Sequence, residues 1–311
     1  MSASTYVIIL NYNNYLDTIE CVTSLFQNVD MKDVTVVIVD NSSTNESYNQ
    51  LKNNISDKVI LLKSDHNWGY ANGNNIGIKY AIDNNAKYIC ILNNDVVVTE
   101  DFLTPCIRVL NQPNTGFVSP RITDYHTSLI QNTGGKVFIE KGCVDRINGD
   151  KQYTNDIPEI IDCDVVYGSC LLLKSSLIKR VGLIPEEYFL FFEETDWCYK
   201  AHTLSYINRS VTGVTVFHKG GASTASFKKS GLVSYLYDRN QVLFTKKYLT
   251  KFGLVRFVVY DILRTLYYNK NNLGNLKSRL SNRLDGLTGK VAKQYDYIYV
   301  GRHKCVDKLQ G

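Results

Sequence analysis

The stretch Tyr88-Ile89-Cys90-Ile91-Leu92-Asn93-Asn94-Asp95 joins five apolar residues to three polar ones. A short run of this kind, with its β-branched and aromatic residues, predicts a buried strand. The polar residues then follow the carboxyl end of that strand, where α/β sheets bind their ligands. Asp95 is therefore the first candidate for a functional carboxylate.

Similar apolar runs come before it, and helical patterns separate some of them. The predicted strands are residues 6–10, 34–39, 59–62 and 88–92, and the predicted helices are residues 16–27 and 73–84. This alternation indicates an α/β fold with a mostly parallel sheet covered by helices. At 311 residues and 44% hydrophobic, the chain can form one large domain with an appendage.

Polar clusters follow the first two strands as well. Asn11-Tyr12-Asn13-Asn14 comes after the first, and Asp40-Asn41-Ser42-Ser43 after the second. One such cluster alone would be read as a turn. Because three clusters end neighbouring strands, we expect them to face one crevice.

Further along, residues 165–173 form another apolar run, and a helix is predicted over residues 174–182. Next comes an aromatic segment, residues 188–197, which contains Glu193, Glu194 and Asp196. Carboxylates beside an aromatic wall are candidates for a general base. The alternative is an acidic helix N-terminus favoured by the helix dipole.

Two more features suggest ligand binding. Asp95 and His218 carry the oxygen and imidazole ligands that suit Mg²⁺ or Mn²⁺, although either residue alone has an ordinary structural interpretation. Residues 67–77 have a glycine at every fourth position from Gly69. This spacing differs from the G-x-G-x-x-G of dinucleotide folds. Two interpretations of the glycines remain: they let the backbone approach a nucleotide closely, or they allow tight packing of a helix.

The eight cysteines contain no C-x-x-C pair, so we expect reduced, buried thiols. The first residues show neither the basic nor the apolar part of a secretory signal, which favours a cytoplasmic protein.

The charge is divided unevenly along the chain. Residues 227–311 hold 17 Lys and Arg against 5 Asp and Glu, a net charge of +12, and this leaves −7 for residues 1–226 because the total is +5. The tail after Ser230 has apolar residues at helical spacing, but charges interrupt it too often for a membrane span. Such a basic helical tail indicates an anionic partner, either a membrane or a nucleic acid.

Taken in order, these motifs resemble the inverting family-2 glycosyltransferases with the GT-A fold, especially the bacterial rhamnosyltransferase-like branch. The resemblance covers about residues 5–250. It implies that Asn11, Tyr12 and Asn13 open a nucleotide pocket and that Asp40 contacts the base. The family's Gly-rich motif corresponds to Asn67, Gly69, Gly73, Asn75 and Gly77, and its metal motif to Asn93, Asn94 and Asp95, with only the second carboxylate kept.

The resemblance also assigns roles in the second half of the chain. Glu194 stands where the family has its base, although the usual residue there is Asp, and Asp196 is expected to bind the acceptor or orient a neighbouring acid. The segment from His218 to Ser223 implies a metal-ligand role for His218. Arg239, in Tyr237-Asp238-Arg239-Asn240, is either a phosphate ligand or a structural helix residue.

The resemblance therefore implies transfer of a sugar, from dTDP-rhamnose or a UDP-hexose, to a hydroxyl of a glycan or lipid-linked saccharide with inversion. Mg²⁺ or Mn²⁺ would be the cofactor, and bacterial surface polysaccharide the product. The expected division is a catalytic domain over residues 1–226, with a nucleotide-sugar half (1–98) and an acceptor half (99–226), and a helical extension over residues 227–311.

Alternatives remain at this point. A sugar nucleotidyltransferase should have a basic Gly-rich loop after the first strand, where this chain has Asn-Tyr-Asn-Asn. A non-catalytic carbohydrate-binding scaffold could keep the fold without the activity, and only the basic tail suggests a nucleic-acid binder, which we do not expect. The tail is predicted either to bind the inner face of the plasma membrane peripherally or to cap the domain or form a homodimer contact.

Overall fold

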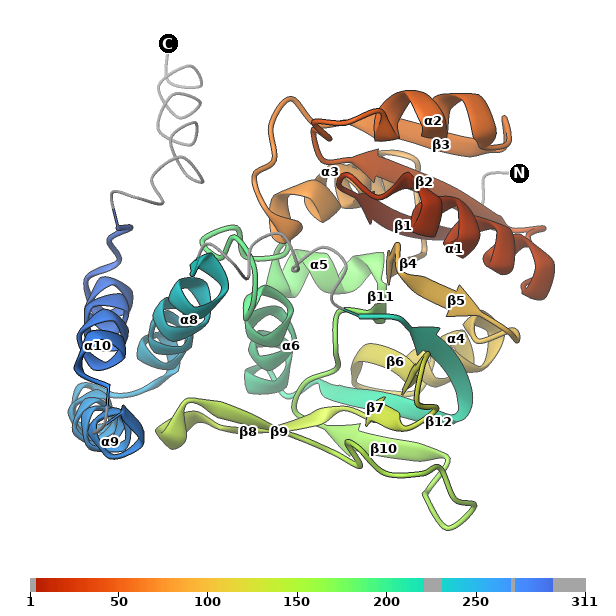
Figure 1. Cartoon of the computed structure of the whole chain (residues 1–311). Coiled ribbons are helices and arrows are strands. Elements are labelled where there is room, and N and C mark those ends of the chain that lie inside the picture. Colours follow the sequence, from red (N-terminus) through yellow and green to blue (C-terminus); the bar gives the residue numbers. More distant parts are fainter. Residues whose placement is uncertain (1–3, 221–230, 270–271, 293–311) are drawn as a thin grey trace.

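A computed structural model of the chain describes residues 4–220, 231–269 and 272–292. Within these residues the stretch from Tyr88 to Asn93 is strand β4, near the middle of a ten-stranded sheet. The main strand order is β10-β12-β6-β11-β4-β1-β2-β3, and the remaining strands are β5, which pairs with β12, and β7, which pairs with β6 (Figure 1). The strands are β1 (Thr5–Asn11), β2 (Val34–Asp40), β3 (Val59–Lys63), β4 (Tyr88–Asn93), β5 (Val96–Val98), β6 (Thr115–Asp124), β7 (Ile130–Asn132), β10 (Ile160–Cys163), β11 (Cys170–Lys174) and β12 (Ile207–His218).

The first four strands run parallel, as expected from the alternation of strands and helices. β1 pairs with both β2 and β4, and this register sets Asn11 beside Asp40 and Leu10 beside Asn93. In the second half of the sheet the directions are mixed, because β11 runs antiparallel to both β4 and β6. The three polar clusters therefore do end at one edge of the sheet.

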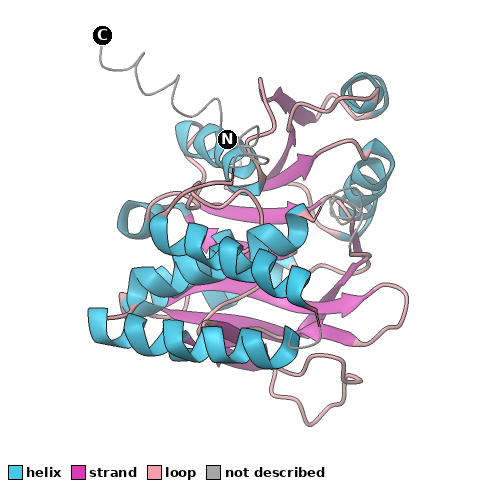
Figure 2. Ribbon diagram, turned by 60° about the vertical axis from the view of Figure 1, so that its left-hand side comes forward, coloured by secondary structure: helices cyan, strands magenta, loops and turns pink. Residues whose placement is uncertain are grey.

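Helices cover both faces of the sheet, which Figure 2 shows as a layered arrangement. This confirms the predicted α/β class, with a mostly parallel sheet between helices. One face packs against α1 (Tyr15–Asn28), α2 (Ser47–Asn54) and α4 (Leu103–Leu110), and the other against α3 (Tyr70–Asp83), α5 (Ser175–Val181) and α6 (Glu193–Thr203).

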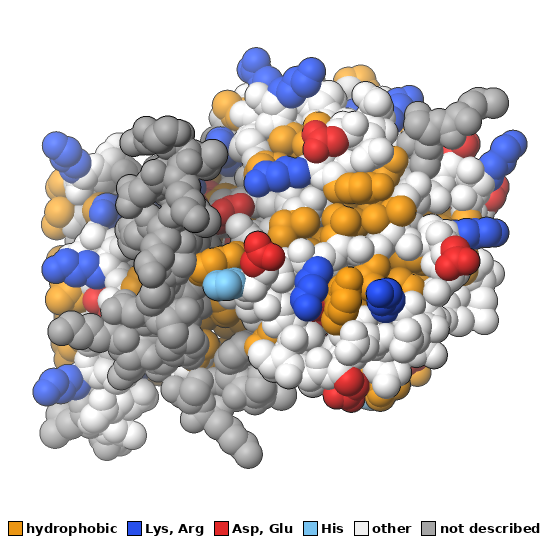
Figure 3. Space-filling view, turned by 90° about the horizontal axis from the view of Figure 1, so that it is seen from above, with side chains coloured by type: hydrophobic (Ala, Val, Ile, Leu, Met, Phe, Trp, Pro, Cys, Tyr) orange, Lys and Arg blue, Asp and Glu red, His pale blue; other side chains and the backbone are white. Residues whose placement is uncertain are grey.

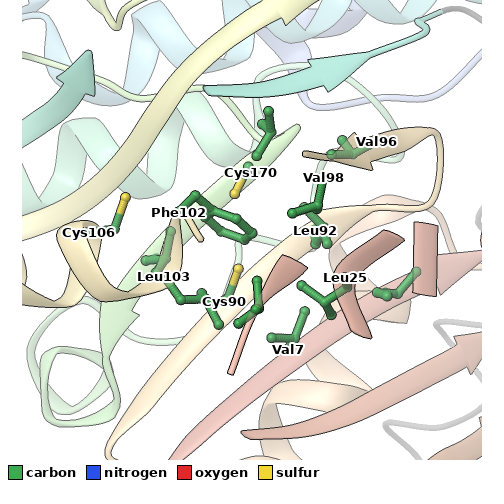
Figure 4. Close-up of a cluster of buried hydrophobic side chains, with 14 of the residues drawn as sticks. Val7, Leu25, Cys90, Leu92, Val96, Val98, Phe102, Leu103, Cys106 and Cys170 are labelled. Carbon is green, nitrogen blue, oxygen red and sulfur yellow. The ribbon is translucent and has the colours of Figure 1, made fainter. Parts of the chain in front are cut away.

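Thiols are part of this core. Cys90, Cys106 and Cys170 lie among Phe102 and Leu103 between the sheet and α4 (Figure 4). All seven cysteines of the described residues are free, and all except Cys143 are buried, in line with the prediction; Cys305 lies outside the described residues.

The apolar run over residues 165–173 is a strand only in its second part. Of residues 165–173, only the part from Cys170 onward forms a strand, β11, because Gly168 and Ser169 make a turn. The carbonyl oxygen of Gly168 accepts a hydrogen bond from the Tyr70 hydroxyl at 2.9 Å, which ties this turn to the start of α3. The turn therefore belongs to the ligand edge of the sheet rather than to its core.

The C-terminal extension is helical, as predicted: α8 (Leu232–Tyr248), α9 (Lys251–Asn269) and α10 (Leu273–Thr288). Buried Asp238 of α8 forms ion pairs with Arg279 and Arg283 of α10, at 2.8 and 2.9 Å, and Arg283 also pairs with Asp261 of α9. Among the described residues, no helix is long and apolar enough to cross a membrane.

Helix α8 also packs against the preceding part of the chain. Phe244 lies in one apolar cluster with Tyr188 and Phe192. Val137 and Ile139 pack against this cluster from a hairpin of β8 (Gly135–Phe138) and β9 (Cys143–Arg146), whose strands are connected by the short helix η1 (Ile139–Lys141). The division of the chain at residue 227 stays a prediction.

Close approach of α3 to the sheet depends on Gly77. A Cβ at this position would lie 2.5 Å from the Ile8 side chain of β1 and 3.3 Å from that of Val39 of β2. We expect Gly77→Ala to lower the free energy of unfolding by about 1–3 kcal/mol through overpacking, although Gly→Ala in a helix usually stabilises. Urea unfolding measures the change.

The matched control is Gly253→Ala in α9, where the nearest atoms are 3.3 Å or more from the added Cβ. That variant should be as stable as the wild type or more stable, by at most about 1 kcal/mol. Equal losses in both variants would contradict this account of the α3 packing.

Candidate active site

A cavity of about 370 Å³ opens at the carboxyl ends of β1, β2 and β4. Its volume falls in the range of small-molecule sites. It brings together polar groups from seven segments of the chain: the end of β1, the loop after β2, the glycine-rich loop, the end of β4, the turn before β11, the start of α6 and the end of β12. The predicted site residues that line it are Tyr12, Asn67, Gly69, Asn93, Asn94, Asp95, Glu193, Glu194 and His218.

Asp95 and His218 face each other on this wall. The distance from His218 Nε2 to Asp95 Oδ1 is 3.2 Å, and both side chains are largely buried. On the other side of the ring, His218 Nδ1 lies 2.7 Å from Gln131 Oε1. The Gln131 amide nitrogen donates to Asp124 and to the His218 carbonyl oxygen, which fixes its orientation and makes Oε1 the acceptor of the Nδ1 proton.

This hydrogen bond leaves the Nε2 lone pair of a neutral His218 directed at the Asp95 carboxylate. Two acceptors 3.2 Å apart repel each other unless they share a proton or a cation. An imidazole oriented by an amide on its far nitrogen is also the usual arrangement of a metal-bound histidine. The pair therefore fits a divalent cation with mixed oxygen and nitrogen ligands.

No group of three His, Cys, Asp or Glu side chains that could hold a metal occurs among the residues that the structure describes. Asn93 supplies an amide at the strand end in place of a further carboxylate, and its Oδ1 accepts a hydrogen bond from the Tyr70 hydroxyl at 3.2 Å. A cation at Asp95 and His218 would thus need most of its ligands from a bound anion or water.

Glu193 and Glu194 form the first turn of α6, and both line the cavity. Burial raises the pKa of both carboxyl groups, and the charge of Glu194 raises the pKa of Glu193 further. One oxygen of each, Oε2, has no hydrogen-bond partner within the described part of the chain. Such groups retain protons more readily than ordinary carboxylates and are suited to proton transfer.

The turn before these acids is strained. Phe191 and Phe192 have φ angles of 70° and 74°, in the left-handed region that bulky residues rarely adopt. The Asn240 amide nitrogen of α8 donates to the carbonyl oxygens of Leu190 and Phe191, at 2.9 and 3.1 Å, and holds the turn in place. Strain kept by surrounding contacts is common at functional sites.

Arg239 does not line the cavity. Its guanidinium donates to Asn240 Oδ1 at 2.7 Å and to the carbonyl oxygens of Glu187 and Lys290, at 3.4 and 3.2 Å. Its side chain therefore supports Asn240 and, through it, the strained turn. Of the two interpretations open at the sequence level, this geometry favours the structural one.

Asp196 also lies away from the cavity. Its buried carboxylate forms an ion pair with Lys247 at 2.5 Å and accepts a hydrogen bond from the Tyr248 hydroxyl. These partners, both on α8, engage both of its oxygens. The acid is placed to join α6 to α8 rather than to meet an acceptor.

Three predicted residues form a polar network under the cavity. Asn11 donates to Asp40 at 2.7 Å, and Asp40 accepts from the backbone and hydroxyl of Ser43. Asn13 pairs with Thr44 through its side chain. Asn11 and Asp40 are fully buried, so they shape the loop after β2, whereas its Asn41 lines the cavity.

The remaining residues of the glycine-rich motif act in packing. A Cβ on Gly73 would lie 2.4 Å from Leu10, and the Asn75 side chain bonds the backbone of Ile184 and the carboxylate of Glu186. Gly69, by contrast, has φ of 90° and lies against the Phe189 carbonyl oxygen. Residues 221–223 of the motif that begins at His218 lie outside the described residues.

Sequence reasoning did not select several residues that line the cavity or support it. Asn41 stands within a cluster already noted, and Ser169 stands in the Gly-Ser pair that interrupts residues 165–173. Tyr70, Tyr167 and Gln131 had no distinguishing pattern. Only the folded chain shows that they lie beside the acids or the imidazole.

Two relatives span most of the chain. The low-salt glycan biosynthesis hexosyltransferase Agl10 of Haloferax volcanii is 25% identical over 249 residues, which cover 79% of this chain and 76% of that protein. The dTDP-rhamnosyl transferase RfbF of Shigella flexneri is 23% identical over 303 residues, which cover 93% of this chain and 97% of that protein.

Solved structures share the fold at low sequence identity. GalNAc-T7 with UDP, GalNAc and Mn²⁺ has a TM-score of 0.61 at 14% identity, covering 97% of this chain and 58% of that one. The mannosyltransferase PcManGT of Pyrobaculum calidifontis with GDP-Man and Mn²⁺ has a TM-score of 0.56 at 14% identity, with 98% and 81% covered. S. aureus TarS 1–349 has a TM-score of 0.56 at 15% identity, with 96% and 83% covered.

These likenesses show that the fold is the GT-A fold of glycosyltransferases. The sequence profile of Glycosyl transferase family 2 matches residues 6–182, which is more than half of the chain. With a carboxylate-imidazole pair and two buried acids in one cavity of that fold, the protein belongs to glycosyl transferase family 2.

Proposed function

We propose that the chain transfers a sugar from a nucleotide-diphospho-sugar to a hydroxyl of a glycan or lipid-linked saccharide, with inversion at the anomeric carbon. The observation that supports this most is that one cavity holds both the Asp95–His218 pair and the acids Glu193 and Glu194. The named relatives transfer a hexose and, from dTDP, a rhamnose. dTDP-rhamnose or a UDP-hexose is therefore the donor we propose.

The donor side of the cavity is formed by the ends of β1 and β4 and by the glycine-rich loop. Asp95 and His218 would hold Mg²⁺ or Mn²⁺, which supplies positive charge to the leaving diphosphate. Tyr12, Asn67 and Gly69 would contact the nucleotide, with Asn93 and Asn94 beside the diphosphate. Asn11, Asn13 and Asp40 would act indirectly, by holding the loop that carries Asn41.

Glu194 is the proposed base. It is less buried than Glu193, so an acceptor can reach it, and its raised pKa makes its carboxylate a stronger base. The acceptor oxygen forms a bond to the anomeric carbon as the bond from that carbon to the diphosphate oxygen breaks. The acceptor proton passes to Glu194, and the nucleoside diphosphate leaves.

The acceptor would reach this base from the half formed by residues 99–226, as the predicted division of the catalytic domain has it, while residues 1–98 would bind the donor. A lipid-linked acceptor requires the protein to approach a membrane. The exposed face of α9 has a composition that suits this task.

Apolar side chains cover that face. Phe252, Val255 and Leu263 are 74%, 62% and 61% exposed, while Phe257 and Asp261 on the opposite side are buried. The other exposed apolar residues of α9 are Val259, Tyr260, Ile262, Leu266, Tyr267 and Tyr268. A helix with one apolar face and a basic surround binds the interface of anionic membranes.

The charges around α9 agree with this. Lys251, Arg256, Lys277 and Lys290 are exposed, and the three acids in the described residues from 231 onward are engaged: Asp238 and Asp261 in ion pairs, Asp285 with Tyr235. Basic and hydrophobic side chains lie together along the left-hand edge of Figure 3, where these helices stand. We propose that this surface binds anionic phospholipid at the inner face of the plasma membrane, during assembly of a bacterial surface polysaccharide on a polyprenyl-diphosphate carrier.

Transfer is tested with UDP-, GDP- and dTDP-sugars in the presence of Mn²⁺ or Mg²⁺. We expect release of the nucleoside diphosphate from one of them, and a loss of about 100-fold or more in Asp95→Asn and His218→Ala. Asp57→Asn, an exposed substitution remote from the cavity, is the control and should keep full activity. If no donor is hydrolysed or transferred, the proposed function is refuted. If Asp95→Asn keeps its full activity, the active site lies elsewhere.

Glu193 gives a prediction on pH. Its pKa in the folded protein lies well above the ordinary 4.5, because of burial and the charge of Glu194, so protonated Glu193 favours the folded state. Its stabilising effect is full below about pH 4.5 and is lost as the pH rises through the raised pKa. Glu193→Gln, which is neutral at every pH, should therefore melt higher than the wild type at pH 8 and equally at pH 4. A lower melting temperature at pH 8 would contradict this.

Membrane binding is tested by flotation with vesicles of phosphatidylcholine alone and with about one third phosphatidylglycerol. The protein should float only with the anionic vesicles, and Phe252→Ser/Leu263→Ser should remain at the bottom. Leu16→Ser, which removes an equally exposed leucine from α1, is the matched control and should float. A wild type that does not float on anionic vesicles, and dimerises through α9 instead, would overturn the membrane proposal.

A further inference from the structure

A second cavity, of about 490 Å³, adjoins the first. It is bounded by the end of β6, by β7, by the end of β9 and the loop after it, and by the turn before β11. Tyr167, Ser169 and His218 line both cavities, so these three residues form the boundary between them. A molecule in the second cavity would therefore lie next to the proposed catalytic centre.

Tyr167 connects this boundary to the base. Burial raises the pKa of its hydroxyl, and the negative charge of Glu194 raises it further, while Arg146 acts in the opposite direction. Both charges therefore act on the phenol. Glu194 also packs against the turn at this boundary, because a Cβ added to Gly168 would lie 3.3 Å from the Glu194 Cγ. A hydroxyl placed at the boundary from the second cavity would therefore lie near Glu194.

Hydrogen bonds and an ion pair orient several side chains of this second cavity. Asp124 Oδ1 accepts hydrogen bonds from the backbone of His126 and Thr127, and its Oδ2 accepts from Gln131. Arg146 donates to the Gln131 carbonyl oxygen at 3.2 Å and pairs with Asp150 at 2.6 Å. Asn132 is 5% exposed, and its Oδ1 has no hydrogen-bond partner in the part of the chain described.

These groups suit the recognition of hydroxyls. Sugar hydroxyls donate and accept at once, so they pair with carboxylates, amides and guanidinium groups held in fixed orientations. The cavity carries two carboxylates, Asp124 and Asp150, against one cation, Arg146. The excess of negative charge disfavours a phosphate or a uronate in this place.

We propose that this second cavity is the acceptor subsite, and that it takes the neutral, hydroxyl-rich end of a saccharide. The proposal rests on the proposed function, since it names the acceptor of that same reaction. The diphosphate of a lipid carrier would then lie outside this cavity, further along the saccharide.

The test uses the donor that is hydrolysed in the assay above, with octyl glycosides of neutral hexoses and 6-deoxyhexoses as acceptors and octyl glucuronide as the charged counterpart. Donor hydrolysis without acceptor reports on the donor site alone. Arg146→Ala and the cavity-filling Leu129→Trp should raise the KM for the glycoside about tenfold or more, and the rate of donor hydrolysis in each variant shows whether its donor site is intact. His126→Ala, in the same turn but outside the cavity lining, is the control and should behave as wild type.

An unchanged acceptor KM in both Arg146→Ala and Leu129→Trp, with hydrolysis intact, would overturn the subsite. A glucuronide used as well as the neutral glycosides would overturn the preference for a neutral acceptor, whereas Asp150→Lys should improve use of the glucuronide if the preference is electrostatic. If the wild type hydrolyses none of the donors, the proposed function itself fails. The failure of the acceptor subsite is therefore distinguishable from it, because the subsite fails only when hydrolysis is present.

Discussion

The pairing of β1 with both β2 and β4 is the constraint on which the candidate site depends. Seven consecutive residues of β1 pair in register with β2, and six with β4, so three polar strand ends meet at one edge. Nearly every side chain of these strands is buried, and a slip by one residue would turn apolar side chains toward the wrong layer. The hydrophobic core thus fixes the position of Asp95 along the sheet.

The acids and the imidazole come to that edge by different routes. His218 ends β12, which has β6 beside it, and its ring orientation depends on Gln131 of β7. Glu193 and Glu194 follow two phenylalanines in left-handed conformation, which contacts from α8 maintain. The packing of the C-terminal helices therefore stabilises the strained turn. Those helices support the candidate site as well as forming a candidate membrane surface.

This arrangement explains why polar residues in the family motifs have unequal roles. Asn11, Asp40, Asn75, Asp196 and Arg239 are engaged with protein groups, in networks that hold the loops at the cavity. Tyr12, Asn67, Asp95 and Glu194 line it. Buried polar side chains need hydrogen-bond partners within the protein. The polar residues beneath the cavity therefore bond to one another and to the backbone, and in this way they hold the loops whose side chains line it.

The sequence alone was sufficient to predict the α/β class, the four parallel strands, the helical tail and the candidates Asp95, His218 and Glu194. Those features follow from local hydrophobic period, from residue type at strand ends and from motif order, all of which are visible along one chain. It was not sufficient to separate Asp196 from Glu194, two residues apart on α6, or to select Tyr70, Tyr167 and Gln131. Only the tertiary structure decided these, because a side chain's direction and its partners depend on residues up to about a hundred positions away.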